Sequence, residues 1–225
     1  MILADAELEL IPEELWNHPS VIRNAKRRRK KPSQMLLDAS LHHFAFKDVS
    51  ESQRRGRPDI VHFFLMLCLD SILNAEGKLT TFVHTRNDEL IEVSPETRLP
   101  KNYNRFVGLM EDLFEKRAVP KSKPLITLRK GMTLKEVLRR CRPKYTVCLS
   151  PDGEPVELIP LFKEAKTPTA CIIGGFPEGD FLSPAKELSD KVVSISPHLL
   201  KIWTVTSNII VSYREAEKAY KQPIH

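Results

Sequence analysis

The sequence predicts an α/β fold, and three observations lead to that prediction. Short β-prone apolar runs alternate along the chain with segments that have helical hydrophobic spacing. The chain has 225 residues with 41% hydrophobic content, which suits one domain, or one domain with an insertion. The C-terminal third contains three short strands, each followed at once by a loop rich in glycine, proline or serine.

The N-terminal quarter predicts a strand, a basic region and then a buried helix. Residues 1–11 alternate enough for a strand, and residues 21–57 are basic around a short apolar island at 35–46. Pro58 suits the first turn of a helix. Residues 59–73 are apolar nearly all round and predict a buried helix.

The middle of the chain predicts a hairpin, a helix and a linker. Residues 79–95 contain two β-prone runs that flank the turn residues 86–89. Residues 102–117 have apolar side chains at helical spacing. Residues 118–130 contain two prolines and predict a linker that leads to a short strand.

A short helix and the three C-terminal strands complete the prediction. Residues 132–141 form the helix, which opens with a capping box of Thr133 and Glu136. The strands are expected at 145–150, 170–173 and 191–196. A turn at residues 151–153 follows the first of them. A long amphipathic helix then covers the rest, from Leu199 to Tyr220.

The charge distribution favours a polyanionic partner. The net charge is +6, and one basic run lies at residues 26–31 while Arg54, Arg55 and Arg57 form a second cluster. Such clusters suit nucleic acid. For the first run, a solvated charge block is an equally good interpretation.

Cysteines, histidines and the N-terminus exclude several classes of protein. The four cysteines include no C-x-x-C pair and the histidines no H-x-x-x-H pattern, so we expect no metal site. Cys68 and Cys171 lie in apolar runs and are expected to be buried, as in a reducing compartment. The acidic N-terminus is not a signal peptide, and the apolar run 60–69 is too short to span a membrane. We expect a soluble protein of the cytoplasm, or of the nucleolus in a eukaryote.

The glycine loop, residues 174–179 (GGFPEG), follows the strand at 170–173 and admits several interpretations. A dinucleotide-binding G-x-G-x-x-G pattern and a P-loop both fail, because the glycine order differs and no Gly-Lys-Ser/Thr follows. A third interpretation is a backbone pocket for an adenine-containing ligand without phosphates, walled by residues 149–153, 174–179 and 194–200. The alternative is that Gly174 and Gly175 only let two segments cross closely.

Three segments together resemble a known family. RRGRPDIVHFFLMLCLDS, IEVSPETRLPKNYNRFVGLM and the pattern GGFPEG…VSIS resemble the pseudouridine-N1-specific methyltransferases of small-subunit ribosome biogenesis, which belong to the SPOUT class. The resemblance implies a homodimeric trefoil-knot fold over residues 1–225 as a single domain. It would have a basic insert at about 21–57, with the knot and donor pocket at about 145–210. Small-subunit rRNA carrying a pseudouridine in a hairpin would be the substrate, and further assembly factors would be partners.

The resemblance also implies a cofactor, S-adenosylmethionine, and assigns it residues. These family positions fall here on Leu149, Gly174, Gly179, Ile195, Ser196, Pro197, His198, Leu199 and Leu200. The absence of phosphate from this donor agrees with the failure of both nucleotide patterns.

The family's RNA-contacting positions fall on Arg57, Arg98, Lys101 and Arg105. Asp59 matches an aspartate that holds the arginine at Arg57 in place, and we assign both residues a catalytic role. Lys101 stands where relatives often have arginine, so it keeps the charge but loses the bidentate fork. If residues 101–105 were helical, Lys101 and Arg105 would share a face.

The reaction implied is methyl transfer to N1 of pseudouridine, an atom that carries a removable proton. No general base is evident, so we expect catalysis by positioning, with Arg57 favouring the anionic base. The alternative is a non-catalytic RNA-binding assembly factor. Outside these positions, we expect Asp70 to be a buried structural carboxylate, His62 a core histidine and Trp203 a core or dimer-interface residue.

Overall fold

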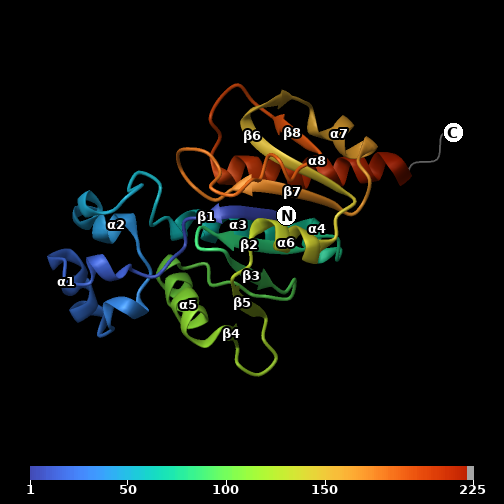
Figure 1. Cartoon of the computed structure of the whole chain (residues 1–225). Helices are drawn as coiled ribbons and strands as arrows, with labels where there is room; N and C mark the ends of the chain where they lie inside the picture. Colours follow the sequence, from blue (N-terminus) through green and yellow to red (C-terminus); the bar gives the residue numbers. More distant parts are fainter. Residues whose placement is uncertain (222–225) are drawn as a thin grey trace.

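An eight-stranded sheet runs through the computed structural model, which describes residues 1–221 (Figure 1). Its strand order is β4-β5-β3-β2-β1-β7-β6-β8. β1 pairs in parallel with β2 and β7, and β6 pairs in parallel with β7 and β8, whereas β2, β3, β5 and β4 are antiparallel. The strands are β1 (Ile2–Ala6), β2 (Thr81–Thr85), β3 (Glu89–Val93), β4 (Ala118–Val119), β5 (Ile126–Lys130), β6 (Tyr145–Pro155), β7 (Thr169–Gly174) and β8 (Lys191–Ser194). The α/β prediction is confirmed.

Helices cover both faces of this sheet. Figure 1 shows α3 and α8 behind the sheet and α6 in front of it, while α1 and α2 lie to one side. The helices are α1 (Pro19–Arg28), α2 (Ala39–His42), α3 (Pro58–Leu69), α4 (Ile72–Ala75), α5 (Tyr103–Lys116), α6 (Leu134–Cys141), α7 (Leu158–Glu164) and α8 (Ile202–Lys221). Three short 3₁₀ helices are η1 (Glu13–Leu15), η2 (Pro32–Gln34) and η3 (His43–Asp48).

The central strands are buried on both sides because their side chains alternate between two cores. In β1, Leu3 packs into the larger core with α3, α5, α7 and α8, whereas Ile2 and Ala4 pack into a smaller core with α6. In β7, Cys171 faces the larger core and Ile172 the smaller one. Near-continuous apolar runs such as residues 170–173 therefore mark strands with no solvent-facing side.

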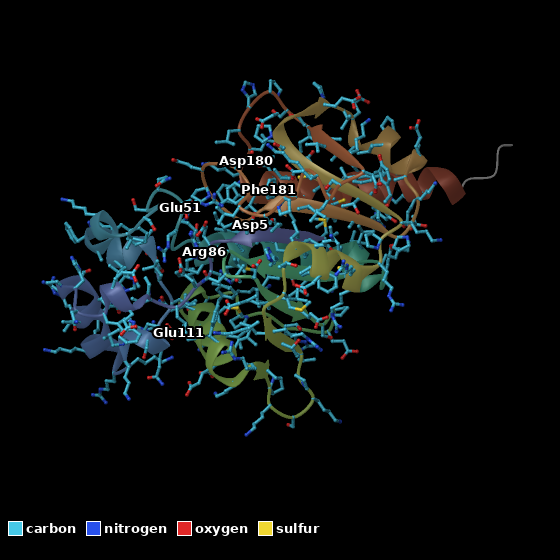
Figure 2. The ribbon with its side chains drawn as sticks, in the orientation of Figure 1. Asp5, Glu51, Arg86, Glu111, Asp180 and Phe181 are labelled. Carbon is cyan, nitrogen blue, oxygen red and sulfur yellow. The ribbon has the colours of Figure 1, made fainter. Side chains whose placement is uncertain are left out.

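Residues 11–49 have a small hydrophobic core of their own, separate from both sheet cores. It includes Ile11, Leu15, Val21 and Met35. Glu111 on α5 joins this region to the rest of the molecule, and Figure 2 shows it at the junction. Its carboxylate accepts hydrogen bonds from Arg28 at 2.5 and 2.7 Å, from Lys30 at 2.7 Å and from the Leu36 backbone at 3.1 Å. The expected basic region is thus a folded one.

Several helices and strands begin or end at other residues than the sequence predicts. The first strand stops at Ala6 rather than at residue 11, and the buried helix stops at Leu69, after which Ser71 caps α4. The linker at 118–130 contains β4 as well as β5, which pair with each other. The turn expected at 151–153 is wrong: β6 continues to Pro155, with an irregular register against β8 between Leu149 and Glu154.

Other local predictions are confirmed. Thr133 and Glu136 form the capping box at the start of α6, and the hairpin of β2 and β3 turns at residues 86–88. Cys68 and Cys171 are buried and unoxidised. Of the helices among residues 1–221, none is long and apolar enough to cross a membrane.

Candidate active site

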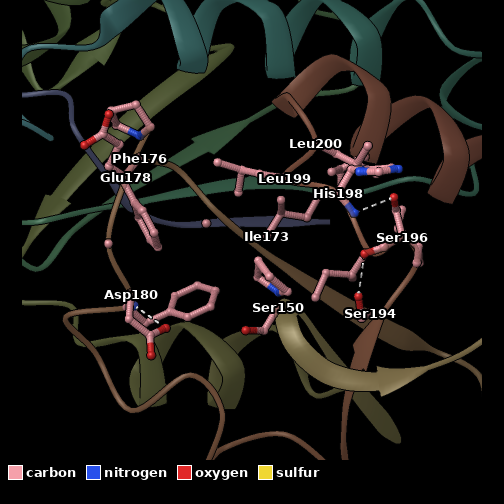
Figure 3. Close-up of a pocket in the computed structure, with 18 of the residues that line it drawn as sticks. Ser150, Ile173, Phe176, Glu178, Asp180, Ser194, Ser196, His198, Leu199 and Leu200 are labelled. Atoms are coloured by element: carbon pink, nitrogen blue, oxygen red, sulfur yellow. Dashed lines mark hydrogen bonds between the residues drawn. The ribbon is translucent and has the colours of Figure 1, made fainter.

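A cavity of about 320 Å³ lies at the carboxyl ends of β7 and β8, beside the residues of β6 that follow its pairing with β7. Ligands of open α/β sheets bind outside this end of the strands. Leu149 and Ser150 on β6, Gly174 at the end of β7 and Ser194 at the end of β8 contribute to its wall. Figure 3 shows Phe176 and Glu178 on one side of this strand-end cavity and Ser196, His198, Leu199 and Leu200 on the other.

The two adjacent glycines of the glycine loop do different things. A Cβ on Gly175 would lie 2.6 Å from the Cα atom of Ala6, so this glycine lets the chain after β7 lie close to the end of the parallel strand β1. A Cβ on Gly174 would lie 2.8 Å from the ring of Phe176, which lines the cavity. Gly179 has a φ of +89°, which favours glycine. Close approach of two backbone segments therefore explains Gly175, whereas Gly174 and Gly179 shape the cavity wall.

The structure brings together nearly all residues predicted to bind the cofactor. Every one of them lines the strand-end cavity except Pro197, which is exposed beside it. Ser150, Phe176 and Glu178 also line the cavity, within the predicted walls. Five lining residues lie outside those walls: Ile173, Asp180, Phe181, Val193 and Val205. Ile173 and Asp180 flank the glycine loop, so their place beside the motif was the available signal.

The polar lining of the cavity suits a cationic ligand without phosphates. No Lys or Arg of the described residues lines it, although the carboxylates of Glu178 and Asp180 do. Asp180 pairs with Lys186 at 2.6 Å, an interaction that lowers the pKa of this carboxyl, whereas Glu178 has no ion-pair partner within residues 1–221. The Ser194 hydroxyl donates to the Ser196 carbonyl and the His198 amide to the Ser196 hydroxyl, both at 3.0 Å, and these bonds hold the turn after β8 (Figure 3).

A second cavity, of about 430 Å³, surrounds Arg57 at the start of α3. Arg57 donates to the two carboxylate oxygens of Asp59 at 2.8 and 2.7 Å, which fixes the plane of the guanidinium. This hydrogen bond to Asp59 raises the pKa of Arg57 and outweighs partial burial, which acts in the opposite direction. Pro58 begins the helix between the two residues, as predicted. The expected holding of Arg57 by Asp59 is confirmed.

Tyr103 and Lys101 line the same Arg57 cavity. Tyr103 donates from its hydroxyl to Asp38 at 2.7 Å, and burial together with this carboxylate raises the pKa of Tyr103 well above its usual value. The hydroxyl therefore stays protonated and acts as a donor. Asp38 also accepts two bonds from Ser40, so its oxygens are occupied.

The other predicted RNA-contacting residues are exposed. Arg98, Lys101 and Arg105 form no salt bridge with any described residue. The expectation that Lys101 and Arg105 share a helix face is wrong, because Asn102 caps α5 and Lys101 precedes the helix. Lys101 reaches the Arg57 cavity from a loop, whereas Arg98 and Arg105 do not line it.

Comparison with known proteins identifies the family. Residues 1–214 match the family described as EMG1/NEP1 methyltransferase. The chain belongs to the EMG1/NEP1 methyltransferase family. Among its relatives, the "Ribosomal RNA small subunit methyltransferase Nep1" of Thermococcus sibiricus is 48% identical over 216 residues, which is 95% of this chain and 96% of that protein. The protein of the same name from Methanothrix thermoacetophila is 46% identical over 213 residues, 95% of this chain and 94% of that protein.

A solved structure agrees with this membership of the EMG1/NEP1 family. The crystal structure of Archaeoglobus fulgidus Nep1 bound to S-adenosylhomocysteine has a TM-score of 0.85 to this chain and is 38% identical. The match covers 96% of this chain and 97% of that one. The family resemblance and the fold class predicted from the sequence are therefore confirmed, while the knot and the dimer stay predictions.

In this EMG1/NEP1 member, the basic cluster predicted at residues 54–57 divides into two kinds of arginine. Arg54 and Arg55 are 4% and 8% exposed and pair with Glu7 and Glu9. They cannot present their charge to RNA, so the interpretation of the whole cluster as a polyanion site is wrong for them. Arg57 alone of the three has a side chain that is 33% exposed.

Three further sequence interpretations can be compared with the structure. His62 is buried against Phe106 with ring centroids 4.4 Å apart, as expected for a core histidine. Asp70 is exposed at the C-terminal end of α3, so its predicted burial is wrong. Trp203 is 45% exposed and is not a core residue.

Trp203 belongs to an apolar face formed by α3, α4 and α8. Phe63, Ile72, Trp203 and Val211 are between 40% and 59% exposed around a shallow hollow. Phe63 and Trp203 pack edge to face with centroids 5.2 Å apart. Phe63, Met66 and Lys101 line both this hollow and the Arg57 cavity, and Val205, two residues after Trp203 on α8, lines the strand-end cavity. The apolar face therefore borders both candidate sites.

Proposed function

We propose that this protein transfers a methyl group from S-adenosylmethionine to N1 of a pseudouridine in small-subunit ribosomal RNA. The observation that carries the proposal is the match to a methyltransferase family over residues 1–214. A solved relative of the same fold is described as bound to S-adenosylhomocysteine, the product that this donor leaves. The strand-end cavity fits such a ligand because its walls are apolar and its charged groups are carboxylates.

Residues of the strand-end cavity would hold the donor, which supplies an electrophilic methyl group on a sulfonium. Leu149, Ile173 and Leu200 would pack against the adenine ring, and the backbone around Gly174, Gly179 and Ser196 would offer hydrogen bonds to its polar edge. Glu178 would stabilise the positive charge of the ligand. The cofactor-binding residues predicted from the sequence are part of this proposal.

Arg57 would act on the RNA side. Its guanidinium is fixed by Asp59 and partly exposed, so it can favour the anionic form of the base once N1 loses its proton. Asp38 and Tyr103 in the same cavity are engaged with each other and do not serve as a base. Arg98, Lys101 and Arg105 would bind phosphates around the flipped nucleotide.

We infer that the active enzyme is a homodimer. In a single chain, the linings of the Arg57 cavity and the strand-end cavity share no residue. The apolar face borders both, and a second copy packed there would bring a strand-end cavity of one protomer toward an Arg57 cavity of the other. We also propose that the enzyme acts in the assembly of the small ribosomal subunit and is located in the cytoplasm.

The test is methyl transfer to two matched hairpins. The protein is incubated with radiolabelled S-adenosylmethionine and an rRNA-like hairpin that carries either pseudouridine or uridine at the loop position. Because uridine has no free N1, we expect label in the pseudouridine hairpin alone. Label in both hairpins would move the target away from N1, and label in neither would favour a binding role in subunit assembly.

A further inference from the structure

Glu7 lies between the two candidate sites, immediately after β1. It is fully buried. Its backbone amide donates to the Gly175 carbonyl in the glycine loop at 3.1 Å, and its backbone carbonyl accepts from the Arg57 amide at 2.9 Å. The backbone of one residue thus joins the loop that lines the strand-end cavity to the segment that carries the RNA-side arginine.

Arg54 extends from the Glu7 carboxylate to the glycine loop. Its Nε donates to Glu7 at 2.6 Å, and its Nη1 donates to the carbonyl of Asp180 at 2.7 Å. The Arg54 Cζ lies 4.3 Å from the ring centroid of Phe176, so the cation packs on the ring that lines the strand-end cavity. A Cβ on Gly179 would lie 3.5 Å from Nη1. One side chain thus contacts two residues that line the cavity, Phe176 in the glycine loop and Asp180 immediately after it.

The charge around Arg54 is balanced without any ligand. Arg86 donates to the second oxygen of Glu7 at 2.8 Å and to Glu51 at 2.7 Å. Two guanidinium groups therefore meet two carboxylates. Arg54 does not line the cavity, and its Nη2 has no hydrogen-bond partner among the described residues. Its effect on a bound ligand must pass through the loop.

Arg55 is a neighbouring arginine that lacks this connection. It is buried to a similar degree and donates through Nε and Nη2 to both oxygens of Glu9, each at 2.8 Å. None of its side-chain hydrogen bonds reaches the glycine loop. The two arginines are alike in burial and in pairing with a glutamate, and they differ because only Arg54 also contacts Phe176 and Asp180.

We propose that Glu7 and Arg54 are positioning residues that hold the glycine loop in the form that binds the methyl donor. This inference rests on the proposed function, since it assigns the strand-end cavity to S-adenosylmethionine. Arg54 fixes the Phe176 ring and the Asp180 carbonyl at once, and only a planar guanidinium can bridge Glu7 and that carbonyl in this geometry. A lysine would keep the charge beside Glu7 and lose the second contact.

The test compares Arg54→Lys with Arg55→Lys in the full chain. Affinities for S-adenosylmethionine and S-adenosylhomocysteine are measured by calorimetry, RNA affinity by fluorescence anisotropy, and folding by thermal melting. We expect Arg54→Lys to weaken donor binding about tenfold and Arg55→Lys to leave it within about twofold. RNA affinity should stay within about twofold for both variants. Glu7→Gln, which weakens the hold on Arg54, should also weaken donor binding.

A measurement on the wild-type protein does not depend on any variant folding. Hydrogen exchange is followed with and without S-adenosylhomocysteine, and we expect slower exchange in residues 50–57 as well as in residues 174–181. Equal loss of donor affinity in Arg54→Lys and Arg55→Lys, or protection confined to residues 174–181, would overturn the inference. If the wild type binds the donor yet labels neither hairpin, the proposed reaction fails while the positioning role stands. If the wild type binds no donor, both fail.

Discussion

At the scale of single residues, burial separates the neighbouring Arg54, Arg55 and Arg57 into interior and accessible side chains. Arg54 and Arg55 are paired with carboxylates in the interior, where an unpaired charge would be costly. Arg57 is paired with a carboxylate that is itself 35% exposed, so water and RNA can reach both groups. Arginines within four positions of the sequence thus differ in role: two form buried ion pairs and one is accessible from outside.

The first residue-scale prediction concerns Arg57. Arg57→Lys should lower the single-turnover methylation rate on saturating pseudouridine RNA by about tenfold or more, because an ammonium cannot hold the two-oxygen contact with Asp59 and face a base. Arg23→Ala, which removes an exposed arginine of α1, is the control and should leave the rate nearly unchanged. Equal rates for wild type and Arg57→Lys would refute the catalytic role.

The second residue-scale prediction concerns Gly174. In Gly174→Ala the new Cβ would meet the Phe176 ring at 2.8 Å, so the ring must shift within the strand-end cavity. We expect weaker S-adenosylmethionine binding by calorimetry and unchanged RNA binding by anisotropy. Gly108→Ala, at a glycine of α5 with nothing within 4 Å and no positive φ, is the control for loss of a glycine. Unchanged donor affinity in Gly174→Ala would argue that the donor binds elsewhere.

A pH effect belongs to Asp5, whose carboxylate accepts from the amides of Leu182 and Ser183 at 2.8 and 3.0 Å. Burial alone would raise the pKa of Asp5, but the hydrogen bonds from His84 and Ser183 outweigh it and the pKa is lowered from 3.8. The ionised Asp5 therefore stabilises the fold above about pH 3.8, the pKa of the unfolded chain, and this stabilisation is lost as the pH falls through the lower pKa of the folded protein. Urea unfolding should show a smaller stability difference between wild type and Asp5→Asn at pH 3 than at pH 7. A constant difference would contradict this linkage.

At the scale of elements, α5 connects the basic N-terminal region to the Arg57 cavity. Tyr103, in its first turn, lines that cavity, and Glu111, two turns later, binds Arg28 and Lys30. The basic run at residues 26–31 therefore has two members engaged in folding, whereas Lys26, Arg27, Arg29 and Lys31 are exposed. The solvated-block interpretation is therefore wrong for Arg28 and Lys30, and binding of a polyanion by the four exposed residues stays a prediction.

The element-scale prediction tests this connection. Glu111→Gln should destabilise the fold by about 2 kcal/mol, less than the roughly 3–5 kcal/mol for breaking a fully buried pair, because Arg28 and Lys30 are partly exposed and can turn to water. Urea unfolding gives the measurement. Asp112→Asn breaks the exposed pair with Lys116 on the same helix and should change stability by no more than about 0.5 kcal/mol. Equal effects of the two changes would mean that Glu111 is not the anchor.

At the scale of the whole molecule, the apolar face is the feature that a single chain leaves unexplained. Four large apolar side chains gather there between the two candidate sites. Clustered exposure of this kind marks an interaction surface. In the proposed homodimer, a second copy of the chain covers this face.

The whole-molecule prediction is that Trp203→Glu converts a dimer to a monomer, as measured by size-exclusion chromatography with light scattering. A charge in the centre of an apolar interface would have to be desolvated without a partner. Phe44→Glu is the control, because Phe44 is 64% exposed but lies on η3, outside this face. A wild-type monomer would remove the dimer from the proposed function.

Local chemistry made much of the fold predictable. Pro58 placed the start of α3, the Thr133 and Glu136 capping box placed α6, and the apolar run at 170–173 placed β7, because each signal acts within a few residues of the chain. The end of β6 was missed, because its residues 151–155 extend through pairing with β8, which lies about forty residues later. The single-domain prediction stays a prediction, although one sheet spans residues 2–194.

The sequence by itself determined the α/β class, the family and most residues of the strand-end cavity, since short motifs carry these. Only the tertiary structure decided which basic residues are free and that Glu7 joins the glycine loop to the segment that carries Arg57. Glu7 and Arg54 are 47 positions apart, and Arg54 and Asp180 are 126 apart. Pairing between such distant groups depends on how the sheet brings its strand ends together, and no local pattern in the sequence encodes it.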